Sequence, residues 1–266
     1  MAAQAVLGEI DAAEAAVGLG GRFPRCLFAA LSNIAPGVDF ERFQRWYFDL
    51  HRPDSLELGL FTRSLRFEAA SPSKVRWLTL WEASYPDLDA ALAKIRPAAL
   101  ALREQGRVWP VQEVPFSQFV FLEGVEAAGS PSIAAAPPTL TTAFGDWRAP
   151  LAGVDHASWR AQALPPRDAL AAAYPASAGY AAAPDGAPTA RRSLWLGSSA
   201  RHPRELEALW PARVERSLPP LGVPTPIFPR SDGAAGEPAP PPCAPDAAWV
   251  VHWRPVPFPG TSPPRY

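Results

Sequence analysis

The chain has 266 residues, and its 25 Lys and Arg nearly balance 26 Asp and Glu, so no strong positive field would attract nucleic acid or an anionic membrane surface. Its 48% hydrophobic residues supply enough apolar surface for a core, whereas 34 Pro and 18 Gly indicate long irregular connections. No uninterrupted apolar run approaches the roughly 18 residues that indicate a membrane-spanning helix.

The N-terminal residues 1–24 are expected to form an extension that is not a signal peptide. They lack a cationic start, and Glu9 and Asp11 interrupt the apolar residues. The two cysteines, Cys26 and Cys243, lie far apart without a C-x-x-C pair, so neither a zinc knuckle nor a disulfide framework is indicated. We therefore expect a cytoplasmic protein.

The first folded segment is expected at residues 25–125. Hydrophobic periodicity predicts strands at 25–34, 60–68, 75–83 and 116–124, a helix from the N-cap Asp39 to about Leu50, and a helix at 87–105. The order β-α-β-β-α-β is typical of a ferredoxin-like unit, an antiparallel sheet with two helices on one face. The fold class is therefore α+β.

A linker is expected at residues 126–138 and a second, degenerate unit at 139–257, followed by a tail at 258–266. The second unit has predicted strands at 139–147, 177–183, 191–199 and 248–256, a weak helix from about residue 157, and a helix at 203–218. A Pro-rich stretch at 219–246 delays the last strand, and its prolines predict an irregular loop.

Two sequence matches at one offset indicate an internal duplication. "GVD" occurs at residues 37–39 and 153–155, and Arg76 has its counterpart in Arg192, both 116 residues later. A duplicated unit can pair with itself, so we expect two sheets that face each other as a pseudo-dimeric α/β barrel. Such a chain can be a monomer, and further homo-oligomers stay open.

The strand at 75–83 is apolar on both faces, because Trp77 and Trp81 alternate with Leu78 and Leu80. Both faces therefore need a covering layer. We expect the helices on the Leu face and the second sheet on the Trp face, around an interior lined by Trp and Phe.

The segment "FQRWYFDLHRPD" at 43–54, followed by "LRF" and "VRWLTLWEA", resembles the W-Y-x-x-x-H-x-P signature of EthD-type proteins in the dimeric α/β-barrel superfamily. The resemblance covers residues 25–123. It implies a barrel with a hydrophobic pocket and small-molecule chemistry, since relatives include cyclases, isomerases, decarboxylases, cofactor-free monooxygenases and, more distantly, haem enzymes.

His51 is the candidate catalytic residue, because at 100° per residue it falls on the buried stripe of its helix together with Tyr47. Pro53 is expected to end the helix near His51, so that carbonyls of the last turn can orient the imidazole for acid-base catalysis. The alternative is a histidine that only caps its helix. Tyr47, one turn earlier, is expected to share the pocket as a hydrogen-bond donor or acid.

Five residues are candidates for substrate binding. Arg66 alternates with Phe67, so if Phe67 faces the helices, Arg66 faces the barrel cavity and can hold a carboxylate or enolate; the alternative is a surface ion pair. Asp54 is expected to orient His51 or to form a turn. Trp46, Trp77 and Trp81 are expected to form cavity walls.

The remaining histidines lack metal-ligand spacing, so no metal site is expected, although His252 keeps a weaker alternative as a haem ligand. At the 116-residue offset Trp46, Tyr47 and His51 correspond to Gln162, Ala163 and Arg167, which predicts a single site in the first half. We expect a cofactor-independent enzyme, of cyclase, decarboxylase, isomerase or dehydratase type, that acts on a hydrophobic small molecule. A non-catalytic barrel that binds a small molecule or a protein is the alternative.

Overall fold

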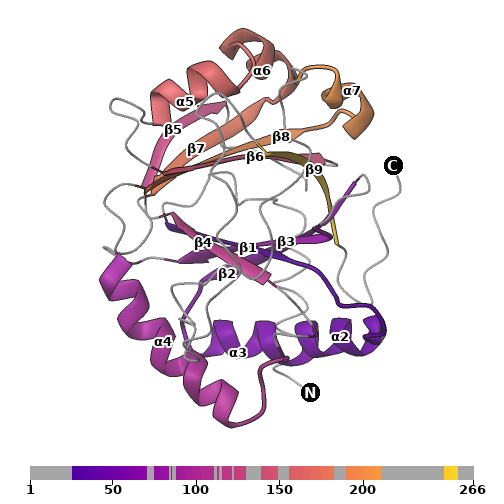
Figure 1. Ribbon diagram of the computed structural model, residues 1–266, viewed down its shortest axis with the longest axis vertical. Helices are drawn as coiled ribbons and strands as arrows, with labels where there is room; N and C mark the ends of the chain where they lie inside the picture. The colour runs from indigo at the N-terminus through magenta and orange to yellow at the C-terminus, as the bar shows by residue number, and fades with distance from the viewer. Residues whose placement is uncertain are drawn as a thin grey trace.

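The computed structural model of the chain (Figure 1) describes residues 26–70, 75–83, 85, 88–110, 113, 116–121, 123–129, 139–148, 156–182, 190–210 and 249–256. The expected N-terminal extension, the Pro-rich loop at 219–246 and the tail at 258–266 lie outside these residues.

The first half contains, in chain order, β1 (Cys26–Ser32), α2 (Phe40–Trp46), the π-helix η1 (Tyr47–His51), α3 (Arg52–Glu57), β2 (Arg63–Ala69), β3 (Trp77–Ala83), α4 (Leu88–Glu104) and β4 (Phe116–Phe121). Asp39 is the N-cap of α2, as predicted, and its side chain accepts a hydrogen bond from the backbone N–H of Arg42 at 3.1 Å. The helical segment that follows is longer than expected, because it continues past Leu50 to Glu57.

The chain continues with β5 (Glu123–Gly129), β6 (Thr139–Arg148), α5 (His156–Ala163), α6 (Arg167–Ala173), β7 (Ala176–Ala182), β8 (Ala190–Ser199), α7 (Pro203–Glu207) and β9 (Trp249–Pro255). The linker expected from residue 126 is wrong for residues 126–129, which belong to β5 and pair with β7. The helix expected at 203–218 is described only as far as Glu207.

All nine described strands form one antiparallel sheet in the order β4-β1-β3-β2-β9-β6-β8-β7-β5. The run β4-β1-β3-β2 and the run β9-β6-β8-β7 have the same internal order, and β2 joins them by pairing Phe67 to Ala69 with Pro255 to Trp253. Figure 1 shows that the sheet curls into two facing layers, with α2, α3 and α4 outside one layer and α5, α6 and α7 outside the other. The α+β prediction is confirmed.

The orientation predicted for β3 is wrong. Leu78 and Leu80 point between the two sheet layers, where they pack with aliphatic residues of β6 and β8 such as Leu140 and Leu194. Trp81 instead packs against the helices, and Trp77 stacks on Phe40 of α2 with ring centroids 5.6 Å apart. Both faces of β3 are apolar, so either could have met the helices. The interior between the layers combines aliphatic side chains with the aromatic rings of Phe67, Phe144 and Trp253.

The helix-side layer of the second half is filled by large aromatic side chains, namely Trp159, Tyr174, Trp195 and Trp210. Trp195 is the counterpart of Thr79 at the 116-residue offset, and Gly197 is the counterpart of Trp81. A Cβ atom at Gly197 would lie 2.7 Å from Cδ1 of Tyr174 and would also strike the Trp195 ring. A glycine at this position therefore makes room for the indole that fills the layer.

Replacement of Gly197 by alanine is expected to lower the free energy of unfolding by about 1 to 3 kcal/mol, because the added methyl group overpacks a layer that is already full. Urea denaturation measures the change. In a Trp195→Leu background the same substitution should cost clearly less, since the clash with the Trp195 ring is gone and only the contact with Tyr174 is left. An equal cost in both backgrounds would contradict the packing explanation.

Candidate active site

A cavity of about 140 Å³ lies between the first-half sheet and its helices, and its lining includes His51, Tyr47 and Arg66. Its floor consists of small side chains on the sheet surface, Ala30 and Ser32 of β1 and Thr79 of β3. In the second half the large Trp195 replaces Thr79 at the same offset. The cavity therefore exists because the first half leaves unfilled the space that an indole occupies in the second.

A π-helix positions two of the candidate residues. The N–H of Arg52 donates to the carbonyl of Tyr47, five residues earlier, so the turn is wider than in an α-helix. In an α-helix, residues five apart are rotated by about 140°, whereas here the rings of Trp46 and His51 stack with centroids 4.8 Å apart and planes 16° apart. The wide turn thus brings Trp46 over His51.

The expected helix end at His51 is wrong, because α3 continues the helical segment directly and Pro53 lies in its first turn. Proline is tolerated in a first turn, since its missing N–H leaves no intrahelical bond unmade there. In an uninterrupted α-helix its ring would clash with the carbonyl of Asp49, and the π-turn just before it relieves that constraint. Carbonyls of a last turn are therefore not available to orient His51.

His51 is half-buried and lies among aromatic rings: Trp46 stacks on it, and Trp81 meets it edge-on with centroids 5.7 Å apart. Within the described residues its imidazole makes no hydrogen bond, while its backbone carbonyl accepts one from Ser55 Oγ at 2.8 Å. Burial, assisted by the nearby positive charge of Arg66 and opposed by Asp54, lowers the pKa of His51 to about 4. At neutral pH the imidazole is uncharged and can accept a proton.

The pKa of His51 makes stability depend on pH. The unfolded chain, with a pKa near 6.5, binds a proton that the folded protein binds only near pH 4, so the free energy of unfolding falls as pH decreases between these values. We expect this contribution to be about 3 kcal/mol. Urea denaturation at pH 7 and pH 4 should show a loss smaller by that amount in His51→Gln than in the wild type. Identical losses would contradict the assignment.

Arg66 is 7% exposed, and its guanidinium carbon lies 3.8 Å from the centroid of the Tyr47 ring and 5.1 Å from that of Phe43. Its Nε and both Nη atoms are buried without a hydrogen-bond partner in the described part of the chain, as is the Tyr47 hydroxyl. Burial lowers the pKa of Arg66 to about 10, with the Tyr47 phenol acting in the opposite direction. The side chain stays charged at neutral pH.

Arg66 reaches this cavity for a reason opposite to the predicted one. Phe67 points between the sheet layers, not toward the helices, so Arg66 points to the helix side. The cavity lies on that side and not inside the barrel, which is why the residue still lines it. Its predicted alternative, a surface ion pair, is wrong because the side chain is buried.

The other predicted binding residues divide into two groups. Trp46 and Trp81 line the cavity, whereas Trp77 is fully buried next to Arg66, with 5.4 Å between the guanidinium carbon and its ring centroid, outside the lining. Asp54 does not bond to His51: its carboxylate accepts two hydrogen bonds from Arg107, one of them from Nε at 2.8 Å. Asp54 therefore fastens α3 to the turn that follows α4.

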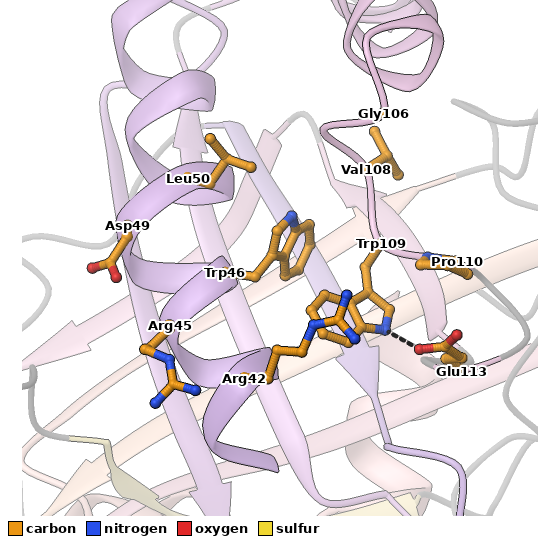
Figure 2. Close-up of a pocket in the computed structure, with 10 residues that line it drawn as sticks. All are labelled: Arg42, Arg45, Trp46, Asp49, Leu50, Gly106, Val108, Trp109, Pro110 and Glu113. Carbon is orange, nitrogen blue, oxygen red and sulfur yellow. Dashed lines mark hydrogen bonds between the residues drawn. The ribbon is translucent and has the colours of Figure 1, made fainter. Parts of the chain in front are cut away.

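A more open hollow of about 440 Å³ lies outside the inner cavity, with α2 and η1 on one side and residues of 106–110 and Glu113 on the other (Figure 2). Figure 2 shows Arg42, Trp46 and Asp49 on the helical side and Trp109, whose Nε1 donates to Glu113 at 3.0 Å, on the other. Trp46, Trp109 and Val108 line both spaces, so they form the partition between them. Trp109 was not among the predicted site residues, and its only signal in the sequence is a large aromatic residue a few positions after a helix and directly before a proline.

The residues aligned with the site in the second half do not form a matching site. Gln162 and Arg167 are exposed, and Ala163 is buried in the layer filled by Trp159 and Trp195. His252 is 7% exposed, and its Nδ1 shares a 2.8 Å hydrogen bond with Thr141 Oγ1.

Among the described residues, no cluster of three or more His, Cys, Asp or Glu side chains is arranged to hold a metal ion. In the same part of the chain, no helix combines the length and apolar character that crossing a membrane requires.

Comparison with known proteins assigns no family. No family model matches the chain, and no curated protein matches it. Among solved structures the chain is similar to "Crystal structure of Putative Chlorite dismutase TA0507", with 9% identity over 88% of this chain and 96% of that chain and a TM-score of 0.38. At this identity and TM-score the match transfers no role to any residue.

Proposed function

We propose that the protein is a cofactor-independent enzyme that moves a proton on a small, largely apolar molecule bound in the inner cavity, with His51 as the base. One observation carries the proposal: an imidazole that is neutral at pH 7, free of hydrogen bonds within the described residues, lines a cavity with aromatic walls. A general base needs an uncharged, accessible nitrogen next to bound substrate.

The proposed step balances without any further reactant. His51 takes a proton from a carbon next to a carbonyl group. The electron pair of the broken C–H bond forms a C=C bond, and the π pair of the carbonyl group moves to its oxygen, which gives an enolate. Where the carbon that loses the proton also adjoins a C=C bond, the enolate is conjugated with that bond, and return of the same proton from His51 to the far carbon of the bond completes an isomerisation that shifts the double bond. Decarboxylation, dehydration and cyclisation are the other reaction types that a histidine in such a cavity serves.

The cavity limits the size of the substrate. Its volume of about 140 Å³ is below the several hundred Å³ of pockets that hold drug-sized ligands. We therefore propose a substrate with one ring or a short chain, and not a polycyclic polyketide.

We further propose that the chain is an EthD-like pseudo-dimer of two ferredoxin-like units. The convergence of Trp46, Tyr47 and His51 on one cavity supports the EthD-like relationship. The repeated strand order β4-β1-β3-β2 and β9-β6-β8-β7 supports the duplication. A single polypeptide then supplies both halves of the barrel.

Haem, the weaker alternative, does not fit the described residues. The cavity beside His51 is smaller than pockets for drug-sized ligands, and a porphyrin exceeds those ligands in size. Nδ1 of His252 is engaged by Thr141, whose side chain also interacts with Tyr174 of the second-half aromatic layer. No step in the proposed reaction uses haem.

A non-catalytic small-molecule carrier is the second candidate, and the aromatic walls around His51 favour it, because they give binding area without reacting. Proton exchange separates the two candidates. Cyclohexanone, phenylacetone and phenylpyruvate are incubated with the protein in D2O, and loss of the proton next to the carbonyl is followed by ¹H NMR. Catalysis predicts faster exchange for at least one compound with the wild type and with the exposed control variant His202→Gln, but not with His51→Gln. A carrier binds without accelerating exchange.

A further inference from the structure

Arg66 carries a buried positive charge at the cavity, and none of its side-chain nitrogens has a hydrogen-bond partner in the described residues. We propose that the inner cavity is an anion site in which Arg66 holds a carboxylate or enolate group of a ligand with a small apolar body. The proposal deepens the proposed function, because it names the class of substrate. Binding of an anion at Arg66 does not require that His51 transfers a proton, so the site can be tested independently of the proposed reaction.

The first argument is energetic. A buried donor without an acceptor costs about 1 to 3 kcal/mol, and more where the donor is charged. A lone buried arginine is therefore destabilising unless a partner completes it. The guanidinium offers a planar fork of N–H donors whose spacing matches the two oxygens of a carboxylate. A bound anion is the partner that this geometry suits.

The second argument concerns counter-charges. Glu68, the acidic side chain whose charge acts on Arg66, is paired with Arg76 at 2.9 Å. Asp54, whose charge acts on His51, holds Arg107. Each carboxylate thus already pairs with another arginine, and the charge of Arg66 is left for a ligand.

The third argument is the aromatic platform. The guanidinium carbon lies 3.8 Å from the Tyr47 ring centroid, with Phe43 at 5.1 Å and Trp77 at 5.4 Å. Cation–π contacts occupy the flat face of a guanidinium, so its N–H groups, which lie in the plane, stay available to an acceptor. The Tyr47 hydroxyl, also unpartnered in the described residues, is a further donor for the same anion.

The remaining walls define the rest of the ligand. Phe61, Trp81 and Ile95 line the cavity with apolar surface. A ligand with a charged end and a small aromatic or aliphatic body satisfies both parts of the cavity. Benzoate is the simplest probe with this chemistry, and benzamide is its neutral counterpart of nearly equal shape.

Binding of an anion also affects His51. The charge of Arg66 is one cause of the low pKa of His51, after burial, and Asp54 acts against it. An anion on Arg66 cancels part of that positive charge, so the pKa of His51 rises and the imidazole becomes a stronger base. The ligand thereby strengthens the group that the proposed reaction uses.

Isothermal titration at pH 7 with benzoate and benzamide tests the proposal. We expect the wild type to bind benzoate at least about 10-fold more tightly than benzamide, a ratio consistent with one charge-assisted hydrogen-bond pair. Arg66→Met should remove the preference, while the control variant Arg103→Met, which deletes an exposed arginine in the last turn of α4, should retain it. Melting temperatures of both variants establish that they are folded.

Equal affinity of the wild type for the two probes, or no binding of either, would overturn the anion site, and so would a benzoate preference that survives in folded Arg66→Met. Benzoate has no hydrogen on a carbon next to its carboxyl group, so its binding does not depend on proton transfer by His51. A benzoate preference without proton exchange on the three ketones would refute the proposed enzyme and leave the anion site. Proton exchange on a ketone without a preference for benzoate over benzamide would support the proposed enzyme and refute the anion site.

Discussion

Replacement of His51 by glutamine is expected to slow proton exchange on an accepted ketone by about 100-fold or more at pH 7, because the side-chain amide cannot take up the proton. The fold should persist, since the imidazole makes no hydrogen bond in the described residues that the variant would lose. Single-turnover exchange rates and melting temperatures, measured on the same samples, separate the loss of chemistry from loss of structure.

The pH dependence of exchange gives the second part of this prediction. The rate for the wild type should rise through about pH 4, as His51 loses its proton, and then stay level through neutral pH. If the ligand is an anion held by Arg66, the rise should move to higher pH once substrate saturates the enzyme. A rate that still rises between pH 7 and pH 9, or a His51→Gln rate within a factor of three of the wild type, would contradict His51 as the base.

Replacement of Arg66 by methionine is expected to stabilise the free protein by about 2 kcal/mol. Burial of the charged guanidinium without hydrogen bonds is unfavourable, as the pKa lowered to about 10 indicates, and an apolar side chain of similar length removes that cost. Loss of the cation–π contacts with Tyr47 and Phe43 offsets part of the gain. Thermal unfolding should show a melting temperature higher by about 4 to 8 °C.

Arg103→Met is the matched control, because Arg103 is exposed in the last turn of α4, and its removal should change the melting temperature by less than about 2 °C. A destabilised Arg66→Met variant would show that Arg66 supports the fold. A residue whose removal raises stability and abolishes ligand binding is retained for function.

Local patterns in the sequence predicted the element order well, because each element has its own period or cap. Asp39 begins α2 as expected, and Tyr47 and His51, four residues apart, line the same cavity. The fold class followed from the order of these elements. The addition of β5 to the far edge of the sheet did not, since strand pairing between distant segments leaves little local signal.

The predictions were wrong where one sequence pattern is compatible with two arrangements of the side chains. Leu and Trp faces of β3 are both apolar, so only the volumes of the facing layers decide which face meets the helices. The same ambiguity applies to β2, so the sequence does not decide whether Arg66 or Phe67 faces the helices. Trp46 stacks on His51 only because the turn between them is a π-turn, which a fixed period of 3.6 residues does not represent.

The position of β9 has a consequence for how the chain folds during synthesis. β9 is the last described strand in the sequence, yet it lies between β2 and β6 in the middle of the sheet. The run β4-β1-β3-β2 is complete before residue 122 leaves the ribosome and can form early, whereas its edge at β2 stays unpaired until residues 249–255 emerge. During most of translation the unpaired backbone groups of β2 can therefore hydrogen-bond to a strand of another chain. The nascent protein is most prone to aggregation in this period, before β9 has been synthesised.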